Sequence, residues 1–145
     1  MLVECIFNSG KDLPIDSRCL NETDETDYSF LKIGAKYIVY GLMFYSCRID
    51  YLICSGKGKP IWIPANLCKI IDSKLSSNWS VCITHLNEDY KVLYDSFNIQ
   101  SIISYPELVT SISHYLGIIE RESDDMKRFF LEKEKMDRES DHVIN

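Results

Sequence analysis

Residues 33–79 read IGAKYIVYGLMFYSCRIDYLICSGKGKPIWIPANLCKIIDSKLSSNW, and this stretch decides the fold. It is the part of the chain richest in β-branched and aromatic residues, and turn residues divide it into short runs. The runs predict strands over residues 36–45, 49–54, 61–63 and 68–71. Gly41 is expected to bend or bulge the first of these strands. Short strands with short connections are typical of a small bent antiparallel sheet or a curled barrel, not of βαβ units.

The long strand 36–45 is apolar on both faces, as expected for a central or strongly bent strand. Simple alternation along it predicts two sets of side chains on opposite faces. One set is Tyr37, Val39, Met43 and Tyr45, and the other is Ile38, Tyr40, Leu42 and Phe44.

The remaining pattern predicts an α+β fold. Residues 2–7 read as a first strand, and residues 80–85 and 90–94 read as a hairpin. Residues 97–104 fit neither a strand nor a helix clearly. Two helices are expected at the end of the chain, one from Pro106 to a stop at Gly117 and one from a cap at Ser123. The second helix is expected to fray over residues 141–145.

The chain length favours one domain over residues 1–145, with a sheet or barrel over about 1–95 and helices over about 105–140. There are 22 acidic and 16 basic residues, which give a net charge of −6. This balance disfavours direct nucleic-acid binding, because the protein repels phosphates. It suits a basic protein partner, although plain solubility explains it equally well.

Six cysteines are present, without a CxxC motif. Four of them, Cys5, Cys47, Cys54 and Cys82, lie in apolar runs, where a free thiol behaves as a small hydrophobic group. The first residues lack the basic segment followed by an apolar segment that is typical of a leader peptide. No run of the sequence approaches the roughly 20 apolar residues of a membrane span. These features predict a cytoplasmic protein with reduced thiols and no membrane association.

Residues 11–30 lack periodicity and contain an acidic cluster over 21–27. The four carboxylates of this cluster are expected to repel one another and to stay solvated. They are Glu22, Asp24, Glu25 and Asp27. Long loops of this kind are usually functional or disordered, so the cluster is either a contact surface or a mobile loop without a role.

No catalytic, cofactor or metal motif emerges. SGKGK at 55–59 precedes Pro60 and a strand, so it reads as a hairpin connection with exposed lysines and not as a phosphate loop. Cys82 and His85 have the spacing of one ligand pair of a zinc site, but the sequence contains no second close pair to complete four ligands. A thiol enzyme with a distant histidine stays open as an alternative. Trp62 and Trp79 are either core anchors or contact anchors.

Residues 62–71, WIPANLCKII, resemble the closing segment of SH3-like barrels. In those barrels a strand ends in a Pro-(Ser/Ala)-Asn turn of 3₁₀ type, and a last short strand follows. The resemblance implies a partial barrel. The aromatic and acidic residues with which SH3 domains grip proline-rich peptides have no clear equivalents here, so this binding mode is not expected to carry over with the barrel. The alternative function is an SH3-like peptide-binding adaptor that uses Trp62 and neighbouring tyrosines as a groove.

The first 80 residues are similar to small bacterial immunity partners of polymorphic toxins, in particular those of contact-dependent growth inhibition systems. The similarity rests on a strand ending in Asn8-x-Gly10, the acidic loop, the segment 33–40 and the segment 60–67, with a charged tail beyond. It implies a non-enzymatic cytoplasmic protein that binds one toxin domain, often a basic nuclease such as an RNase, and blocks its active site. The predicted partner-binding residues are Glu22, Asp24, Glu25, Asp27, Tyr28 and Trp62.

Overall fold

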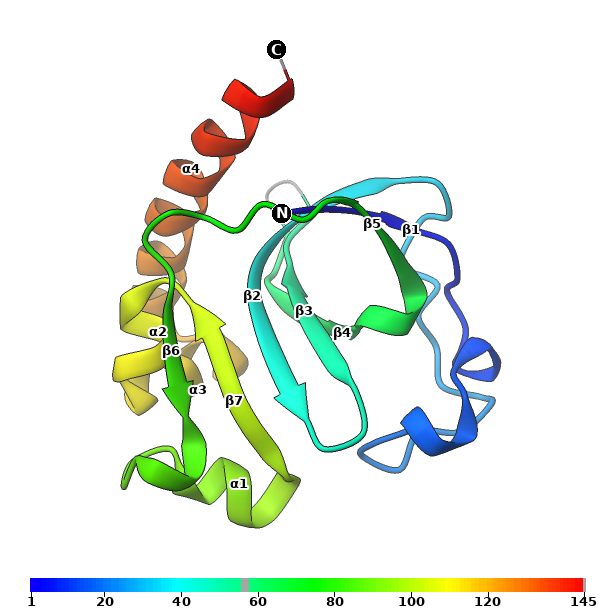
Figure 1. The fold of residues 1–145 in the computed structure, drawn as a ribbon, viewed down its shortest axis with the longest axis horizontal. Coiled ribbons are helices and arrows are strands. Elements are labelled where there is room, and N and C mark those ends of the chain that lie inside the picture. The colour runs from blue at the N-terminus through cyan, green and yellow to red at the C-terminus, as the bar shows by residue number, and fades with distance from the viewer. Residues whose placement is uncertain (56–57, 145) are drawn as a thin grey trace.

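The computed structural model describes residues 1–55 and 58–144. Seven strands form one bent antiparallel sheet, and five of these lie side by side in the order β4-β3-β2-β1-β5 (Figure 1). They are β1 (Leu2–Cys5), β2 (Lys36–Tyr45), β3 (Ile49–Ile53), β4 (Ile61–Pro64) and β5 (Cys68–Asp72). A 3₁₀ turn over Ala65–Leu67 joins β4 to β5, as the sequence predicts. The predicted α+β fold with a bent, unclosed antiparallel sheet is confirmed.

The long strand β2 belongs to two parts of the sheet. Its first residues pair with β1, and its last residues pair on the same side with β7 (Ile99–Ser104), which in turn pairs with β6 (Ser80–Ile83). The partner changes at Gly41, where the register with β3 also shifts. A Cβ atom at Gly41 would lie 3.1 Å from the Ser104 Oγ and 3.2 Å from the Trp62 ring. The predicted irregularity at Gly41 is confirmed, and a larger residue there would have to displace the Ser104 or Trp62 side chain by a few tenths of an ångström.

The irregularity at Gly41 corrects the predicted faces of β2. Before Gly41, Tyr37 and Val39 point into a core enclosed by the bent sheet; after it, Leu42 and Phe44 do so. A second core, between the sheet and the helices, takes the complementary residues: Ile38, Tyr40, Met43 and Tyr45. Simple alternation is wrong beyond Gly41 because one extra residue exchanges the two faces of a strand.

The predicted hairpin over 80–94 is wrong. Residues 91–97 form the helix α1 (Lys91–Phe97), and β6 pairs with β7 instead. The Asn87 side chain accepts hydrogen bonds from the backbone N–H groups of Asp89 and Tyr90, which starts the helical turn. Asn98 ends the helix in a left-handed conformation with φ of 55°. The buried pair Tyr90 and Leu93 has a spacing of three, which fits a helix and not a strand.

Three helices follow β7, where the sequence predicts two. They are α2 (Pro106–Thr110), α3 (Ile112–Glu120) and α4 (Ser123–Ile144). Ser111 separates α2 from α3 because its hydroxyl accepts the His114 N–H and caps α3. Gly117 is not a helix stop: it lies inside α3, where a Cβ atom would collide with the Asp125 carboxylate of α4. The helix ends instead at Arg121, with φ of 63°.

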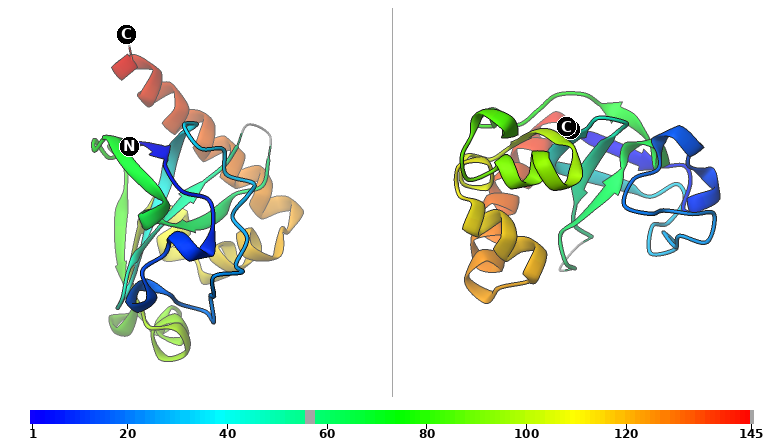
Figure 2. Two further views of the ribbon diagram at one scale, coloured as in Figure 1. Left: turned by 90° about the vertical axis from the view of Figure 1, so that its right-hand side faces the viewer. Right: turned by 90° about the horizontal axis from the view of Figure 1, so that it is seen from below.

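The helices lie on one side of the molecule, and the long connection from β1 to β2 lies on the other (Figures 1 and 2). That connection contains only two 3₁₀ turns, Gly10–Asp12 and Ile15–Ser17, and an isolated bridge from Ser9 to Asp27. In the described part of the chain no helix is long and apolar enough to cross a membrane. Gly56 and Lys57 of the predicted 55–59 connection, and Asn145 of the predicted frayed end, lie outside the described residues.

Candidate binding site

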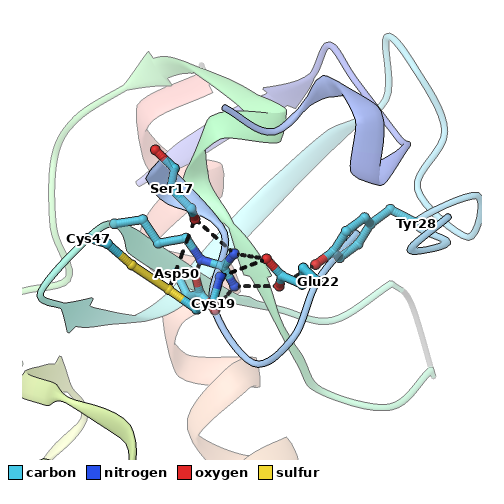
Figure 3. The surroundings of a disulfide bond; sticks show 7 residues. Ser17, Cys19, Glu22, Tyr28, Cys47 and Asp50 are labelled. Carbon is cyan, nitrogen blue, oxygen red and sulfur yellow. Dashed lines mark hydrogen bonds and ion pairs between the residues drawn. A yellow bond between two sulfur atoms is a disulfide. The ribbon is translucent and has the colours of Figure 1, made fainter. Parts of the chain in front are cut away.

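The 17–28 loop is fastened to the turn between β2 and β3. Cys19 forms a disulfide with Cys47 of that turn (Figure 3). The prediction that all thiols are reduced is therefore wrong for this pair. Cys47 lies exposed in the turn, not inside a strand, which leaves its sulfur accessible to the loop. The other four cysteines, Cys5, Cys54, Cys68 and Cys82, are not part of a disulfide in the described structure.

Close to the disulfide in sequence, Arg48 joins the loop to the sheet. Its Nε donates to Asp50 Oδ1 at 2.7 Å, and its Nη2 donates to Glu22 Oε1 at 2.8 Å. Its Nη1 donates to the other Glu22 oxygen and, at 3.3 Å, to the backbone carbonyl of Ser17. All three charged side chains are buried, with exposures of 2% for Arg48, 8% for Glu22 and 4% for Asp50. The cluster thus holds one cation between two carboxylates away from water.

The pKa values follow from burial and these bonds. Burial alone would raise the pKa of Glu22, but hydrogen bonds from Arg48, Tyr28 and the Cys19 N–H outweigh it and lower the pKa. For Asp50 burial dominates, so its pKa is raised although Arg48 donates to it. Burial and the Glu22 carboxylate raise the pKa of Tyr28, so its hydroxyl stays a donor. The cluster carries one more negative charge than Arg48 compensates.

Two of the predicted contact residues are largely buried and are engaged within the fold. Glu22 is engaged by Arg48, so the expectation that all four carboxylates stay solvated is wrong for this residue. Tyr28 is buried, and its hydroxyl donates to Glu22 Oε1 at 2.8 Å. Together they close the base of a short turn over residues 23–27, which we call the acidic turn.

The other three predicted acids, Asp24, Glu25 and Asp27, are exposed on the acidic turn. The turn has internal order: the Thr26 N–H donates to the Thr23 carbonyl at 3.1 Å, and the Gly10 N–H donates to the Thr26 carbonyl at 2.8 Å. Asp24 pairs with Arg18 at 2.5 Å. The backbone N–H of Ser29 donates to Asp27 and lowers the pKa of that carboxyl. The acidic turn therefore presents three carboxylates on an ordered backbone, and one of them, Asp24, is partly neutralised.

Trp62 does not project as a free anchor. It is half-buried on β4, packs against the core between sheet and helices, and touches the position of Gly41. It lines a hollow of about 360 Å³, which we call the Trp62 pocket. The pocket is lined by Leu20, Glu22, Tyr28, Met43, Tyr45, Arg48, Asp50, Pro60, Ile61, Trp62, Tyr115, Ile118, Ile119 and Arg121. The structure thus brings Glu22, Tyr28 and Trp62 together around one pocket, with the acidic turn extending from its edge.

Two arginines of this site are missed by the sequence reading. Arg48 and Asp50 are separated by one residue at the start of an apolar strand, so their side chains share a face. That spacing is a usable signal for a buried ion pair. Arg121 carries no such signal, because its place in the pocket depends on how α3 packs against β4.

A second polar array lies among the helices. The Tyr105 hydroxyl is 2.7 Å from His114 Nε2, and His114 Nδ1 is 2.7 Å from Asp125 Oδ1. The arrangement resembles a proton relay, but the Tyr105 and His114 side chains are fully buried, so a substrate has no access. Its role is to tie α2, α3 and α4 together. No group of three or more metal-ligating side chains occurs among the residues described.

Comparisons of the chain with models of protein families, with curated proteins and with solved structures found no match.

Proposed function

We propose that this protein is an immunity protein that binds a cognate bacterial toxin domain, a basic nuclease such as an RNase, and blocks its active site. The observation that carries the proposal is the acidic turn, which holds Asp24, Glu25 and Asp27 exposed on a base fixed by Glu22 and Tyr28. In this proposal the protein is not an enzyme, needs no cofactor and makes no direct contact with nucleic acid.

Fixing the acidic turn supports binding in two ways. A loop that is ordered before association loses less conformational entropy when it binds. Three carboxylates near a basic cleft also speed the encounter, because the fields of the two surfaces are complementary. The net charge of −6 acts in the same direction. In the proposed complex the carboxylates occupy the positions that substrate phosphates would take in the nuclease.

Testing the proposed toxin binding first requires the partner to be identified. The tagged protein is used to recover what binds it tightly in its source cell, and the recovered domain is then produced in pure form. We expect a single basic domain. The double substitution Asp24→Lys and Glu25→Lys should lower its association rate by about tenfold or more at low salt and weaken the dependence of that rate on salt.

The matched control is Glu88→Lys with Asp89→Lys, which makes the same charge change at exposed residues ahead of α1. It should change the association rate much less, because these residues lie away from the acidic turn. If both double variants slow association equally, only the net charge matters and the acidic turn is not the contact.

The cytoplasm is the compartment in which we propose the protein acts. Disulfides are uncommon in reducing cytosol, apart from catalytic and redox-sensing pairs. The thiol state of Cys19 and Cys47 in protein trapped by rapid alkylation therefore tests the proposed compartment. A fully formed disulfide in freshly lysed cells would argue against it.

A peptide-binding adaptor is the second candidate, and the Trp62 pocket is the observation that favours it. The pocket places Trp62 with three tyrosines, Tyr28, Tyr45 and Tyr115, in a partial barrel. Burial raises the pKa of Tyr45 to about 12, so its ring stays neutral. Aromatic grooves of this kind hold proline-rich segments in SH3 domains. An array of proline-rich peptides without any binder would remove this candidate.

A further inference from the structure

Arg121 differs from the other arginines of the chain. Each of Arg18, Arg48, Arg128 and Arg138 donates to a carboxylate. Within the described residues, Arg121 forms an ion pair with no carboxylate, and its Nη1 donates only to the backbone carbonyls of Pro60 and Ile118. These bonds hold the guanidinium in place while its Nε and Nη2 make no hydrogen bond to the described residues. Arg121 is therefore a positioned cation whose charge no side chain of the described fold neutralises.

Arg121 borders two hollows of the surface. The residue ends α3 in a left-handed conformation and lines the Trp62 pocket. It also lines a neighbouring hollow of about 380 Å³ next to Phe30 and Tyr37, and Ile61 borders both hollows. Its guanidinium thus lies where two hollows meet. Such a volume is within the range of small-ligand pockets, which combine an apolar lining with a few polar groups.

The rest of the Trp62 pocket combines apolar walls with a charged cluster. Beside Arg121 lie Pro60 and Ile118, whose carbonyls it binds, and Trp62 follows Pro60 by two residues. Glu22 and Asp50 also line the pocket, but both are held by Arg48, so neither neutralises Arg121. Because this cluster has an excess of one negative charge, a ligand anion is repelled from it and attracted to Arg121.

We propose that the Trp62 pocket binds a carboxylate that is attached to an apolar or aromatic body. The carboxylate accepts hydrogen bonds from the free Nε and Nη2 of Arg121, the forked geometry that suits a carboxylate. The body packs against Trp62 and Ile118. The carboxylate belongs either to a free small molecule or to the C-terminal residue of a peptide. This inference does not depend on toxin binding, which involves the acidic turn.

The first test compares N-acetyl-phenylalanine with its amide, using the full chain and the indole N–H signals of the two tryptophans in NMR spectra. We expect the acid to shift the Trp62 signal, with the amide binding at least about tenfold more weakly because it lacks the charge. The Trp79 indole donates to the sulfur of Met136 at 3.3 Å, so its signal serves as an internal control. Equal binding of acid and amide, or no shift of Trp62 at roughly 10 mM acid, would overturn the proposal.

The second test uses Arg121→Gln, which should weaken binding of the acid by about tenfold or more. Arg138→Gln is the matched control, because it removes the same charge from an exposed residue of α4 and should leave binding unchanged. Unchanged binding by a folded Arg121→Gln variant contradicts the proposal. If that variant does not fold, the comparison of acid and amide on the natural chain still decides.

A third comparison separates the two sources of the carboxylate. A short peptide that ends in phenylalanine is measured as the free acid and as the C-terminal amide. Tighter binding of the peptide acid than of N-acetyl-phenylalanine supports a peptide C-terminus as the ligand. Equal affinities support a free carboxylate, since the preceding residues then add nothing.

Discussion

Arg48 is the residue on which the binding site depends most. It compensates two carboxylates that folding removes from water, one from the 17–28 loop and one from β3. Removing one partner of a buried ion cluster leaves uncompensated charge behind, which is far more costly than losing a surface pair.

We expect Arg48→Met to lower the free energy of unfolding by about 3–5 kcal/mol, because Glu22 and Asp50 would remain buried without their cation. Arg138→Met, at a side chain that is 72% exposed, should change it by less than about 0.5 kcal/mol. Urea unfolding of both variants at neutral pH measures the difference. Similar midpoints for the two would show that the cluster does not stabilise the fold.

The Glu22 carboxylate should give this cluster a defined pH dependence. Its pKa is lower in the folded protein than its ordinary value of 4.5, so ionised Glu22 stabilises the fold above that pH. This contribution is lost as the pH falls through the folded pKa. The pKa of Asp50 is shifted upwards, chiefly by burial, and this burial is common to both proteins of the comparison.

Glu22→Gln should therefore be less stable than the natural chain at pH 7, and the gap should narrow steadily below about pH 4.5. Unfolding free energies of the two proteins across this range test the expectation. A gap that is constant with pH would mean that the charge of Glu22 is not what stabilises the cluster.

At the scale of single residues, the sequence identifies the acidic cluster but not the difference among its members. Four carboxylates with the same local pattern divide into one buried and three exposed. The reason is Arg48, which lies 26 residues after Glu22 and reaches it only through the fold. Local pattern contains no information on such a long-range pair.

Among the elements, the 17–28 loop is tied to the β2–β3 turn by the Cys19–Cys47 disulfide. Its two cysteines are 28 residues apart. A cross-link over a loop of that length stabilises a fold by roughly 3 kcal/mol in the chain-entropy account. Because Arg48 holds the same loop independently, opening the disulfide should loosen the loop without releasing it.

We expect a reducing agent to speed amide hydrogen exchange in the 17–28 loop and to lower the free energy of unfolding by up to roughly 3 kcal/mol. The double variant Cys19→Ser with Cys47→Ser should show the looser loop at once and should not respond to the agent. Exchange rates that are identical before and after reduction of the natural chain would contradict the tether.

Helix α4 should depend on a few buried side chains, since most of its surface is charged. Phe129 is fully buried and packs edge-on against Tyr40 of β2. Phe129→Ala should cost about 3–5 kcal/mol of unfolding free energy. Leu131→Ala on the same helix, at a side chain that is 60% exposed, should cost less than about 0.5 kcal/mol. Equal small losses would mean that α4 is not packed on the sheet.

At the scale of elements, the strands of the 33–79 stretch are predictable because each has a local β pattern between turn residues. The segment 90–94, YKVLY, is not, because its aromatic and β-branched residues favour a strand although the spacing of Tyr90 and Leu93 also fits a helix. The helix forms because the Asn87 side chain starts its first turn and the left-handed backbone of Asn98 ends it. The burial of Tyr90 and Leu93 adds to this. The sequence predicts the bulge at Gly41, but it does not predict that the bulge exchanges the two faces of β2.

In the whole molecule, β2 connects the two halves of the chain. It pairs with β1 in the bent sheet and with β7 next to the helices, and the two cores lie on its opposite faces. One domain over the whole chain stays a prediction. The acidic turn and the Trp62 pocket both lie close to the turn that ends β2, so this strand also positions the candidate binding site.

The measurement that tests the central claim most directly is nuclease activity of the recovered toxin domain with increasing amounts of this protein. Toxin neutralisation predicts that cleavage of RNA or DNA falls to the background level at an equimolar ratio. It also predicts that the Asp24→Lys, Glu25→Lys variant needs a larger excess than the Glu88→Lys, Asp89→Lys control. Cleavage that is unchanged at several-fold excess of the natural chain would contradict the proposed function.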